Sequence, residues 1–345
     1  MIAILCLNAG IDRTYEVAQL TPGALHRPER VRMNAGGKGI NVARVAARLG
    51  QEVVVSGFAG GSGATFIAGY LRREGILADF VDIGEESRVC INIIDRERRT
   101  QTQVDEAGPL VTPSEVDKLR AKWPLLLAKS QLAVISGSAP RGVPHSLYRE
   151  LVATARRGNV PCILDARGEM LREGIEGRPQ MIKPNVQELA ELVGRELPTA
   201  EDIAQAARGV VERGVQIVLV STGARGAIAA TRSHGTWLAR PPAIEYVSAV
   251  GSGDAMVGAF AALLAQQRPL RDCLRWATAA GAANAATFGP AFCTREEIER
   301  LVPGVETMRV DALETLQAQW AAPRTRQETM TAPGSNGDAT ASQQT

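Results

Sequence analysis

Short apolar runs alternate with longer amphipathic segments over most of this chain. The runs are typical of buried strands, and the segments between them have the apolar spacing of helices. The apolar runs lie at 2–7, 52–59, 132–137, 162–166, 180–183 and 216–221, and the helix-like segments near 39–49, 63–74, 114–128, 145–158, 186–193 and 200–213. This alternation predicts an α/β fold, with a mainly parallel sheet covered by helices on both faces.

Other parts of the chain depart from this alternation. Two Ala-rich helices are expected at about 253–267 and 270–287. Residues 12–34 and 86–105 contain strand-like pieces that are too polar for the buried sheet, so we expect a second, small sheet there. It would form a lid over the carboxyl edge of the main sheet, where open α/β sheets bind ligands. The segment 322–345 is rich in Thr, Ser, Gln, Pro and Gly, and we expect it to be a disordered tail.

The composition excludes several classes of function. The 345 residues carry a formal net charge of +2 and only 4% aromatic residues, which argues against a nucleic-acid-binding surface. No apolar run reaches membrane-spanning length. The five cysteines and three histidines are scattered, so neither a zinc site nor a disulfide framework is expected. We therefore expect a cytoplasmic protein without membrane or nucleic-acid partners.

The segment 247–265 is the most informative part of the sequence, because an apolar run there enters a glycine-rich turn and then a long apolar helix. The turn contains Gly251, Ser252, Gly253 and Asp254. Backbone N–H groups at such a helix start can form an anion hole, and Asp254 could serve as a base beside it. The alternative is simple helix capping by the Asp254 carboxylate.

A second glycine-rich segment covers residues 33–50 and places Lys38 among three glycines, just before a predicted helix. Lys38 could bind a phosphate, and the amide of Asn41 could bind sugar hydroxyls. The spacing is not that of a Walker A loop. A flexible turn with a solvated lysine is the alternative.

Three further pieces carry weaker signals. In 181–192, Lys183, Asn185 and Glu188 follow a strand, where they could serve Mg²⁺ and phosphate or simply form a capping box. In 219–230, a turn with two glycines could wrap a nucleotide or be an ordinary hairpin. Ser138 and Arg88 could bind a sugar hydroxyl and a phosphate, or be a loop serine and a surface arginine.

Together these pieces resemble the ribokinase-like carbohydrate kinases, also called the phosphofructokinase-B family. The resemblance covers about residues 1–320 and rests on GGKGINVARVAARLG, KPN-x-x-E, STGARGA and AVGSGDAMVGAFAA in this order. It implies one three-layer α/β/α kinase domain with a small β-sheet lid. The segments CLNAGIDRTYEV, SRVCINIID, VDEAGPLVTPSE and SGSAPRGVP are most similar to the hexose-phosphate branch, which comprises 1-phosphofructokinase and tagatose-6-phosphate kinase.

The resemblance also implies roles for individual residues. Asp254 would be the catalytic base, and Gly251, Ser252 and Gly253 would form the anion hole. The sugar site would comprise Asp12, Gly37, Asn41 and Ser138, with Lys38 and Arg88 on the phosphate that the sugar already carries. Lys183, Asn185 and the metal-binding Glu188 would serve ATP and Mg²⁺, and Ser221, Gly223, Gly226 and Asn284 would line the nucleotide site. Arg27, in the lid, would reach a phosphate across a dimer.

The implied reaction is ATP-dependent phosphorylation of D-fructose 1-phosphate to fructose 1,6-bisphosphate. Tagatose 6-phosphate and fructose 6-phosphate are alternative substrates, and a catalytically silent sugar-phosphate-binding regulator is the alternative of another class. A homodimer through the lid is also implied. Three departures from the family pattern leave the substrate open: Ala9-Gly10 after Asn8, Arg141 in place of a common proline, and Ser252 in place of a common alanine.

Overall fold

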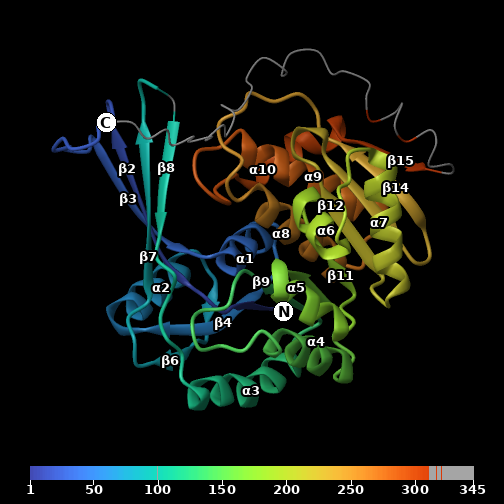
Figure 1. The fold of residues 1–345 in the computed structure, drawn as a ribbon, viewed down its shortest axis with the longest axis horizontal. Helices are drawn as coiled ribbons and strands as arrows, with labels where there is room; N and C mark the ends of the chain where they lie inside the picture. The colour runs from blue at the N-terminus through green and yellow to red at the C-terminus, as the bar shows by residue number, and fades with distance from the viewer. Residues whose placement is uncertain (99, 311–315, 317–319, 321–345) are drawn as a thin grey trace, which may run out of the picture.

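A long, mainly parallel sheet forms the centre of the computed structural model, which describes residues 1–98, 100–310, 316 and 320 (Figure 1). Its strands follow the order β15-β14-β13-β12-β11-β10-β9-β1-β4-β5, and β6 pairs with β4. The strands are β1 (Ile2–Cys6), β4 (Val53–Gly60), β5 (Leu77–Ala78), β6 (Val81–Ile83), β9 (Leu132–Ser136), β10 (Cys162–Asp165), β11 (Met181–Ile182), β12 (Ile217–Ser221), β13 (Ala227–Thr231), β14 (Gly235–Arg240) and β15 (Glu306–Val310). Pairing is parallel from β5 to β12 and antiparallel from β12 to β15.

Helices cover both faces of this sheet. One face carries α3 (Pro113–Leu127), α4 (Leu147–Arg157), α5 (Gly168–Glu176), α6 (Val186–Val193) and α7 (Ala200–Glu212). The other carries α1 (Lys38–Arg48), α2 (Gly61–Arg73), α8 (Ser252–Ala265), α9 (Leu270–Ala285) and α10 (Arg295–Leu301). Along β1, Ala3 and Leu5 join one core while Ile2 and Ile4 join the other. Successive side chains of a strand point to opposite faces, so this alternation produces the three-layer α/β/α architecture.

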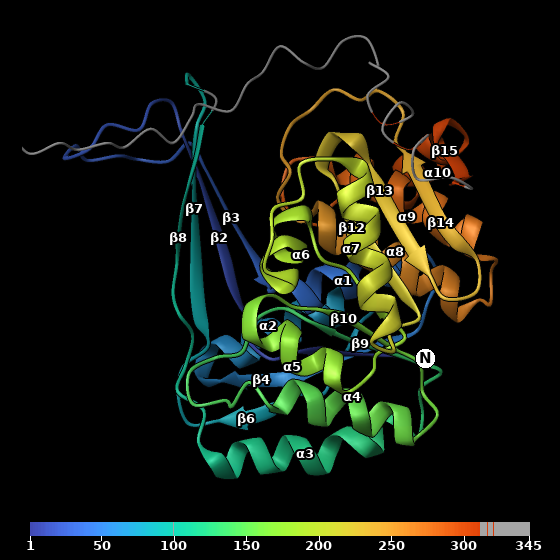
Figure 2. The ribbon, with the colours of Figure 1, turned by 45° about the vertical axis from the view of Figure 1, so that its right-hand side comes forward.

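A separate four-stranded sheet stands beside the layered body (Figure 2). It follows the order β3-β2-β7-β8 and consists of β2 (Gly10–Val17), β3 (Arg30–Gly36), β7 (Arg88–Asp95) and β8 (Thr100–Asp105). The central pair β2–β7 is parallel, and both edge pairs are antiparallel. This sheet confirms the predicted lid, and its polar strands are explained by their partly exposed faces.

Most predicted elements are confirmed with small shifts at their ends, but α5, α10, β5, β6, β14 and β15 are missing from the prediction. The sequence of β14 offers little to identify it, because this strand needs β13 and β15 on either side to bury its apolar residues. Two short 3-10 turns, η1 (Gly223–Arg225) and η2 (Val302–Gly304), connect β12 to β13 and α10 to β15. The predicted tail at 322–345 lies outside the described residues. Within them, no helix combines the length and apolarity needed to cross a membrane.

Candidate active site

The carboxyl ends of adjacent parallel strands bring polar side chains together at one edge of the sheet. Cys6, Ser136 and Asp165 are the last residues of β1, β9 and β10, and Lys183 follows β11 directly. A cavity of about 240 Å³ opens at this edge. It is lined by Cys6, Asn8, Lys38, Arg88, Asp105, Ser136, Gly137, Ser138, Asp165, Ala166, Arg167 and Glu188.

Asp254 is buried in the first turn of α8. Its Oδ1 lies 3.0 Å from Nζ of Lys38, and its Oδ2 accepts a 2.9 Å hydrogen bond from Nδ2 of Asn41. The N-cap of α8 is Gly251, and no side chain caps that position. The capping interpretation is therefore wrong for Asp254, whose carboxylate is directed to α1 instead.

The backbone at Gly251 explains why the turn needs a glycine. Its φ is +81°, and a Cβ at this position would lie 2.7 Å from Cα of Pro290. A side chain would therefore be strained by the left-handed backbone and would also clash with Pro290. The helix start can keep this shape only if residue 251 is glycine.

Asn284 holds this turn from inside the protein. The fully buried side chain donates to the carbonyl oxygen of Val250 (2.8 Å) and to Oγ of Ser252 (3.1 Å). Its Oδ1 accepts a 2.6 Å hydrogen bond from the backbone N–H of Ala291. These contacts hold the backbone of the glycine turn in place, and the nucleotide contact that the resemblance implies for Asn284 stays a prediction.

Asp165, which the sequence analysis missed, binds two lysines of the site. Its carboxylate lies 3.5 Å from Nζ of Lys38 and 3.2 Å from Nζ of Lys183, and it accepts a 3.0 Å hydrogen bond from Ser136. Burial alone would raise the pKa of Asp165, but the two lysines outweigh burial and lower it to about 2. In turn, Asp165 first and Asp254 second raise the pKa of Lys38. The pair of carboxylates therefore keeps Lys38 charged, and this lysine is held beside Asp254 rather than free in solvent.

Lys183 connects this cluster to the glycine turn. Its side chain is buried, and a Cβ on Gly253 would lie 3.2 Å from its Nζ. The ammonium group is thus adjacent to the N-terminus of α8, where backbone N–H groups also favour anions. Both features suit the binding of a phosphate.

Asn185 and Glu188 form the capping box that the sequence left as an alternative. Glu188 N–H donates to Oδ1 of Asn185 (2.8 Å), and Asn185 N–H donates to Oε2 of Glu188 (2.9 Å). Glu188 also lines the cavity, and its charge contributes to the raised pKa of Lys38. The Glu188 carboxylate therefore caps α6 and is at the same time accessible from the cavity.

The donor set fits Mg²⁺ held mainly by water and phosphate. Among the described residues, no group of three or more His, Cys, Asp or Glu could hold a metal ion. Mg²⁺ usually keeps several waters and takes one or two carboxylates together with substrate phosphates. Glu188 and Asp165 at the cavity supply such carboxylates.

Of the predicted sugar-site residues, Lys38, Arg88 and Ser138 line the cavity, whereas Asp12, Gly37 and Asn41 do not. Arg88 donates to the carbonyl oxygen of Asn8 (3.1 Å) and to that of Glu106 (3.4 Å). The Asn8 amide donates to Oγ of Ser138 at 3.4 Å. Asn8 and Arg167, which the sequence analysis did not assign, line the same cavity.

Asp12 lies on β2 against the lid glycine Gly36. Burial raises the pKa of Asp12 to about 6, although Arg88 and Arg44 oppose this shift. A Cβ on Gly36 would lie 2.2 Å from Oδ1 of Asp12, so the glycine makes room for the carboxylate. Gly37 follows as the N-cap of α1.

The remaining predicted residues lie outside the cavity lining. Ser221 ends β12 and pairs with Asn185 in an isolated bridge, and Gly223 and Gly226 form the turn to β13. Arg27 is exposed between β2 and β3. The strand order places the turn beyond β11, on the Lys183 side of the site.

Fold and site together define a class of protein: a three-layer α/β enzyme fold with a carboxylate, two lysines and a glycine turn at the start of one helix. The model of the pfkB family of carbohydrate kinases matches residues 4–297. The chain belongs to the pfkB family of carbohydrate kinases.

Solved structures agree with this family. Phosphofructokinase-2 from Escherichia coli, in complex with substrates and products, is 29% identical with a TM-score of 0.82, covering 88% of this chain and 98% of that one. A candidate 1-phosphofructokinase from Thermotoga maritima is 28% identical with a TM-score of 0.79, covering 90% of this chain and 100% of that one. Ribokinase from Arabidopsis thaliana, at 20% identity and a TM-score of 0.67, shares the fold, covering 87% of this chain and 98% of that one.

Proposed function

We propose that this protein transfers the γ-phosphoryl group of ATP to a hydroxyl group of D-fructose 1-phosphate, producing fructose 1,6-bisphosphate and ADP. The observation that carries the proposal is the position of Asp254. Its carboxylate lies in the first turn of α8, next to an anion-binding glycine turn and in contact with Lys38 and Asn41. Base, anion hole and cation are the groups that phosphoryl transfer needs.

The reaction begins when Asp254 accepts the proton of the sugar hydroxyl. The hydroxyl oxygen forms a bond to the γ-phosphorus, and the bond from that phosphorus to the oxygen bridging to the β-phosphate breaks, so that ADP leaves with the electron pair. Negative charge on the transferred group is stabilised by the backbone N–H groups at the start of α8 and by Lys183, next to Gly253. Mg²⁺, when bound near Glu188, supplies further positive charge to the ATP phosphates.

Lys38 has two roles in this scheme. It is half-exposed at the cavity while its Nζ contacts Asp254 and Asp165. It therefore holds the Asp254 carboxylate in place at the start of α8, and it can turn toward a phosphate that enters the cavity.

The cations that line the cavity favour a phosphorylated sugar. Lys38, Arg88 and Arg167 share this lining, and an arginine guanidinium can bind a phosphate through two parallel hydrogen bonds. The candidates for binding the sugar hydroxyls remain Asp12, Asn41 and Ser138, through their side chains, and Gly37, through its backbone.

Two neighbours bear on the substrate. One Escherichia coli phosphofructokinase-2 structure holds fructose 6-phosphate, and the Thermotoga maritima protein is described as a candidate 1-phosphofructokinase. Fructose 6-phosphate and tagatose 6-phosphate are therefore the alternatives to be tested beside fructose 1-phosphate.

For the nucleotide, we propose the turn after β12. Ser221, Gly223 and Gly226 lie there. The isolated β-bridge between Asn185 and Ser221 places this turn beside the segment that contains Lys183 and Glu188. ATP would thus extend from this turn toward the start of α8. Asn185 supports the turn in addition to capping α6.

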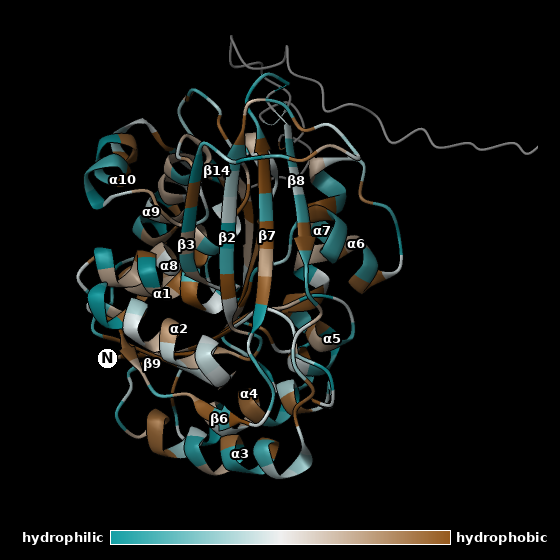
Figure 3. Cartoon of the chain, turned by 90° about the vertical axis from the view of Figure 1, so that its left-hand side faces the viewer, coloured by the Kyte–Doolittle hydropathy of each residue, from teal (hydrophilic) through white to brown (hydrophobic). Residues whose placement is uncertain are grey.

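We also propose that a second copy of the chain binds the lid. Val31 and Val104 are 51% and 56% exposed on the lid strands, and Met33 is also exposed. Figure 3 shows hydrophobic segments on the lid strands across this side of the molecule. Exposed apolar side chains on one sheet favour association. Sedimentation of the wild type and of a V31S/V104S variant tests this, since only the wild type should be dimeric.

Measurement of ADP release with a panel of sugars tests the proposed reaction. The panel comprises the three hexose phosphates and their unphosphorylated sugars. We expect turnover with fructose 1-phosphate and none with free fructose. Turnover only with another member of the panel would change the substrate. The absence of turnover with every member, together with sugar-phosphate binding, would support the regulatory alternative.

A further inference from the structure

The amide of Asn41 is held between two groups of opposite hydrogen-bonding character. An ionised carboxylate such as Asp254 can only accept, and a guanidinium such as Arg44 can only donate. Nδ2 of Asn41 donates to Asp254 (2.9 Å), and Oδ1 of Asn41 accepts from Nη1 of Arg44 (3.1 Å). The partners thus determine which way the amide points. We propose that Arg44 is a positioning residue that acts through Asn41 to orient the catalytic carboxylate, an inference that rests on the proposed role of Asp254.

Arg44 is itself rigidly held. Its side chain is 1% exposed, and Nε lies 2.8 and 3.0 Å from the two carboxylate oxygens of Glu74. Nη2 donates to the carbonyl oxygen of Ala35 at 3.0 Å. The guanidinium also lies over the ring of Phe292, 4.6 Å from its centroid. Contacts on all sides leave Arg44 little freedom, and a fixed donor is what the orientation of an amide requires.

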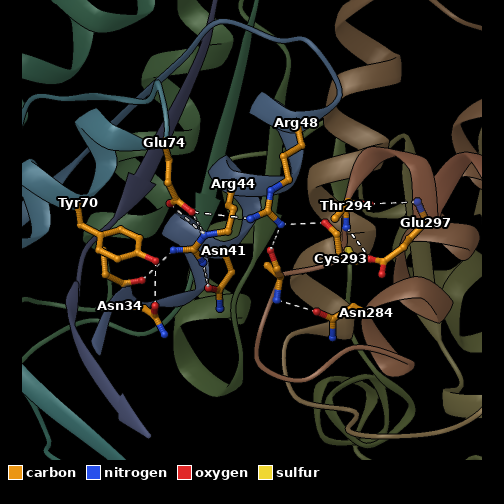
Figure 4. A network of polar contacts seen from close by, with 12 residues as sticks. Asn34, Asn41, Arg44, Arg48, Tyr70, Glu74, Asn284, Cys293, Thr294 and Glu297 are labelled. Atoms are coloured by element: carbon orange, nitrogen blue, oxygen red, sulfur yellow. Dashed lines mark hydrogen bonds and ion pairs between the residues drawn. The ribbon is translucent and has the colours of Figure 1, made fainter. Parts of the chain in front are cut away.

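The same carboxylate connects Arg44 to the other side of the glycine turn (Figure 4). Nη2 of Arg48 lies 3.8 Å from Glu74, and Nη1 of Arg48 donates to the carbonyl oxygens of Ala291 and Cys293, each at 2.8 Å. Ala291 N–H donates to Asn284, the residue that holds the turn. Glu74 therefore anchors two arginines. Of these two, Arg44 bonds to Asn41 and Arg48 does not.

The loss of Arg44 would free the amide to rotate. Oδ1 of Asn41 would have lost its donor, so the hydrogen bond from Nδ2 to Asp254 would no longer be held in place from the other side. The carboxylate would then lose its fixed orientation, and the proton transfer would lose its geometry. Displacement of a catalytic group by about 1 Å can cost about 100-fold in rate.

A double-mutant cycle tests the proposal. We expect Arg44→Met to lower kcat by about 10- to 100-fold, with the KM for ATP changed less than about twofold. If Arg44 acts through Asn41, adding Asn41→Ala to Arg44→Met should lower kcat little further. Arg48→Met is the matched control, because Arg48 shares Glu74 but does not bond to Asn41, and its effect should multiply with that of Asn41→Ala. Effects of Arg44→Met and Asn41→Ala that multiply would overturn the proposal.

Two further measurements keep the test independent of folding and of the proposed function. If Arg44→Met does not fold, Arg44→Lys replaces it in the cycle, because lysine keeps the positive charge beside Glu74 but lacks the second nitrogen that bonds to Asn41. NMR of the Asn41 side-chain amide requires no turnover. The two amide protons should exchange with water slowly in the wild type and rapidly in the variant. Equal exchange in both proteins would refute the orienting role, whereas an inactive wild type with this difference would refute only the proposed reaction.

Discussion

Replacement of Asp165 by asparagine would remove the negative charge that Lys38 and Lys183 share. The pKa of Asp165 is about 2 in the folded protein against an ordinary 3.8. That difference corresponds to about 2 kcal/mol of unfolding free energy at neutral pH. Lys183 is also buried and would face a neutral amide, and breaking a buried pair by removing one partner costs about 3–5 kcal/mol. We expect a total loss of about 2–5 kcal/mol.

Urea denaturation at neutral pH measures this loss. Asp272→Asn is the matched control, because Asp272 pairs with Arg268 on the surface at 2.8 Å and should contribute below about 0.5 kcal/mol. A folded-state pKa that is lowered stabilises the protein above pH 3.8 and stops doing so as the pH falls toward 2. The difference between wild type and Asp165→Asn should therefore narrow over that range. A loss no larger than that of the control would refute the assigned electrostatics.

Three further predictions concern the sugar site and the glycine turn. Lys38→Ala and Arg88→Ala should each raise the KM for the sugar phosphate at least about tenfold, as expected for a lost charged hydrogen bond; unchanged KM values would exclude a phosphorylated substrate bound by these residues. The pKa of Asp12, about 6, predicts that kcat/KM falls as the pH drops through that value, because the protonated carboxyl accepts fewer hydrogen bonds; Asp12→Asn should lack this decline, and a variant that kept it would assign the titration to another group. Gly251→Ala should lower both Tm and kcat. Gly194→Ala is the control, because Gly194 also has a positive φ (+71°) but a Cβ there would have no neighbour within 4 Å, so this variant should lower only Tm, and by a smaller amount. Equal losses of Tm in the two variants would show that the clash with Pro290 does not contribute.

Hydrophobic periodicity was sufficient to predict the layers of the fold. Strands such as Ile2–Cys6 and Leu132–Ser136 are buried on both faces, so their sequences are almost continuously apolar. The lid was identifiable because its strands are partly or wholly exposed to solvent and therefore carry many polar residues. By contrast, β14 is covered on one side by β15, which is distant in sequence. Helix α5 has only nine residues, and the few that it buries (Leu171, Gly174 and Ile175) gave no clear periodic pattern.

The site was predictable only where a motif brought its residues together in sequence. Asp254 and Lys38 stand in glycine-rich segments, but whether Asp254 caps its helix depends on how α8 packs against α1. Asp165 stands alone at the end of an apolar run. The one local signal was a carboxylate at the carboxyl end of a buried strand. The role of Arg44 requires Glu74 and Phe292, which only the tertiary structure places beside it.

The most direct measurement of the central claim is the turnover of Asp254→Asn with ATP and fructose 1-phosphate. Loss of a general base costs about 10²- to 10⁴-fold, so we expect kcat to fall by at least that factor. Asparagine keeps the size of the side chain, and Lys38 keeps its contact with Asp165, so calorimetry should show both substrates still bound. A variant that binds both substrates and turns over near the wild-type rate would contradict the assignment of Asp254 as the base.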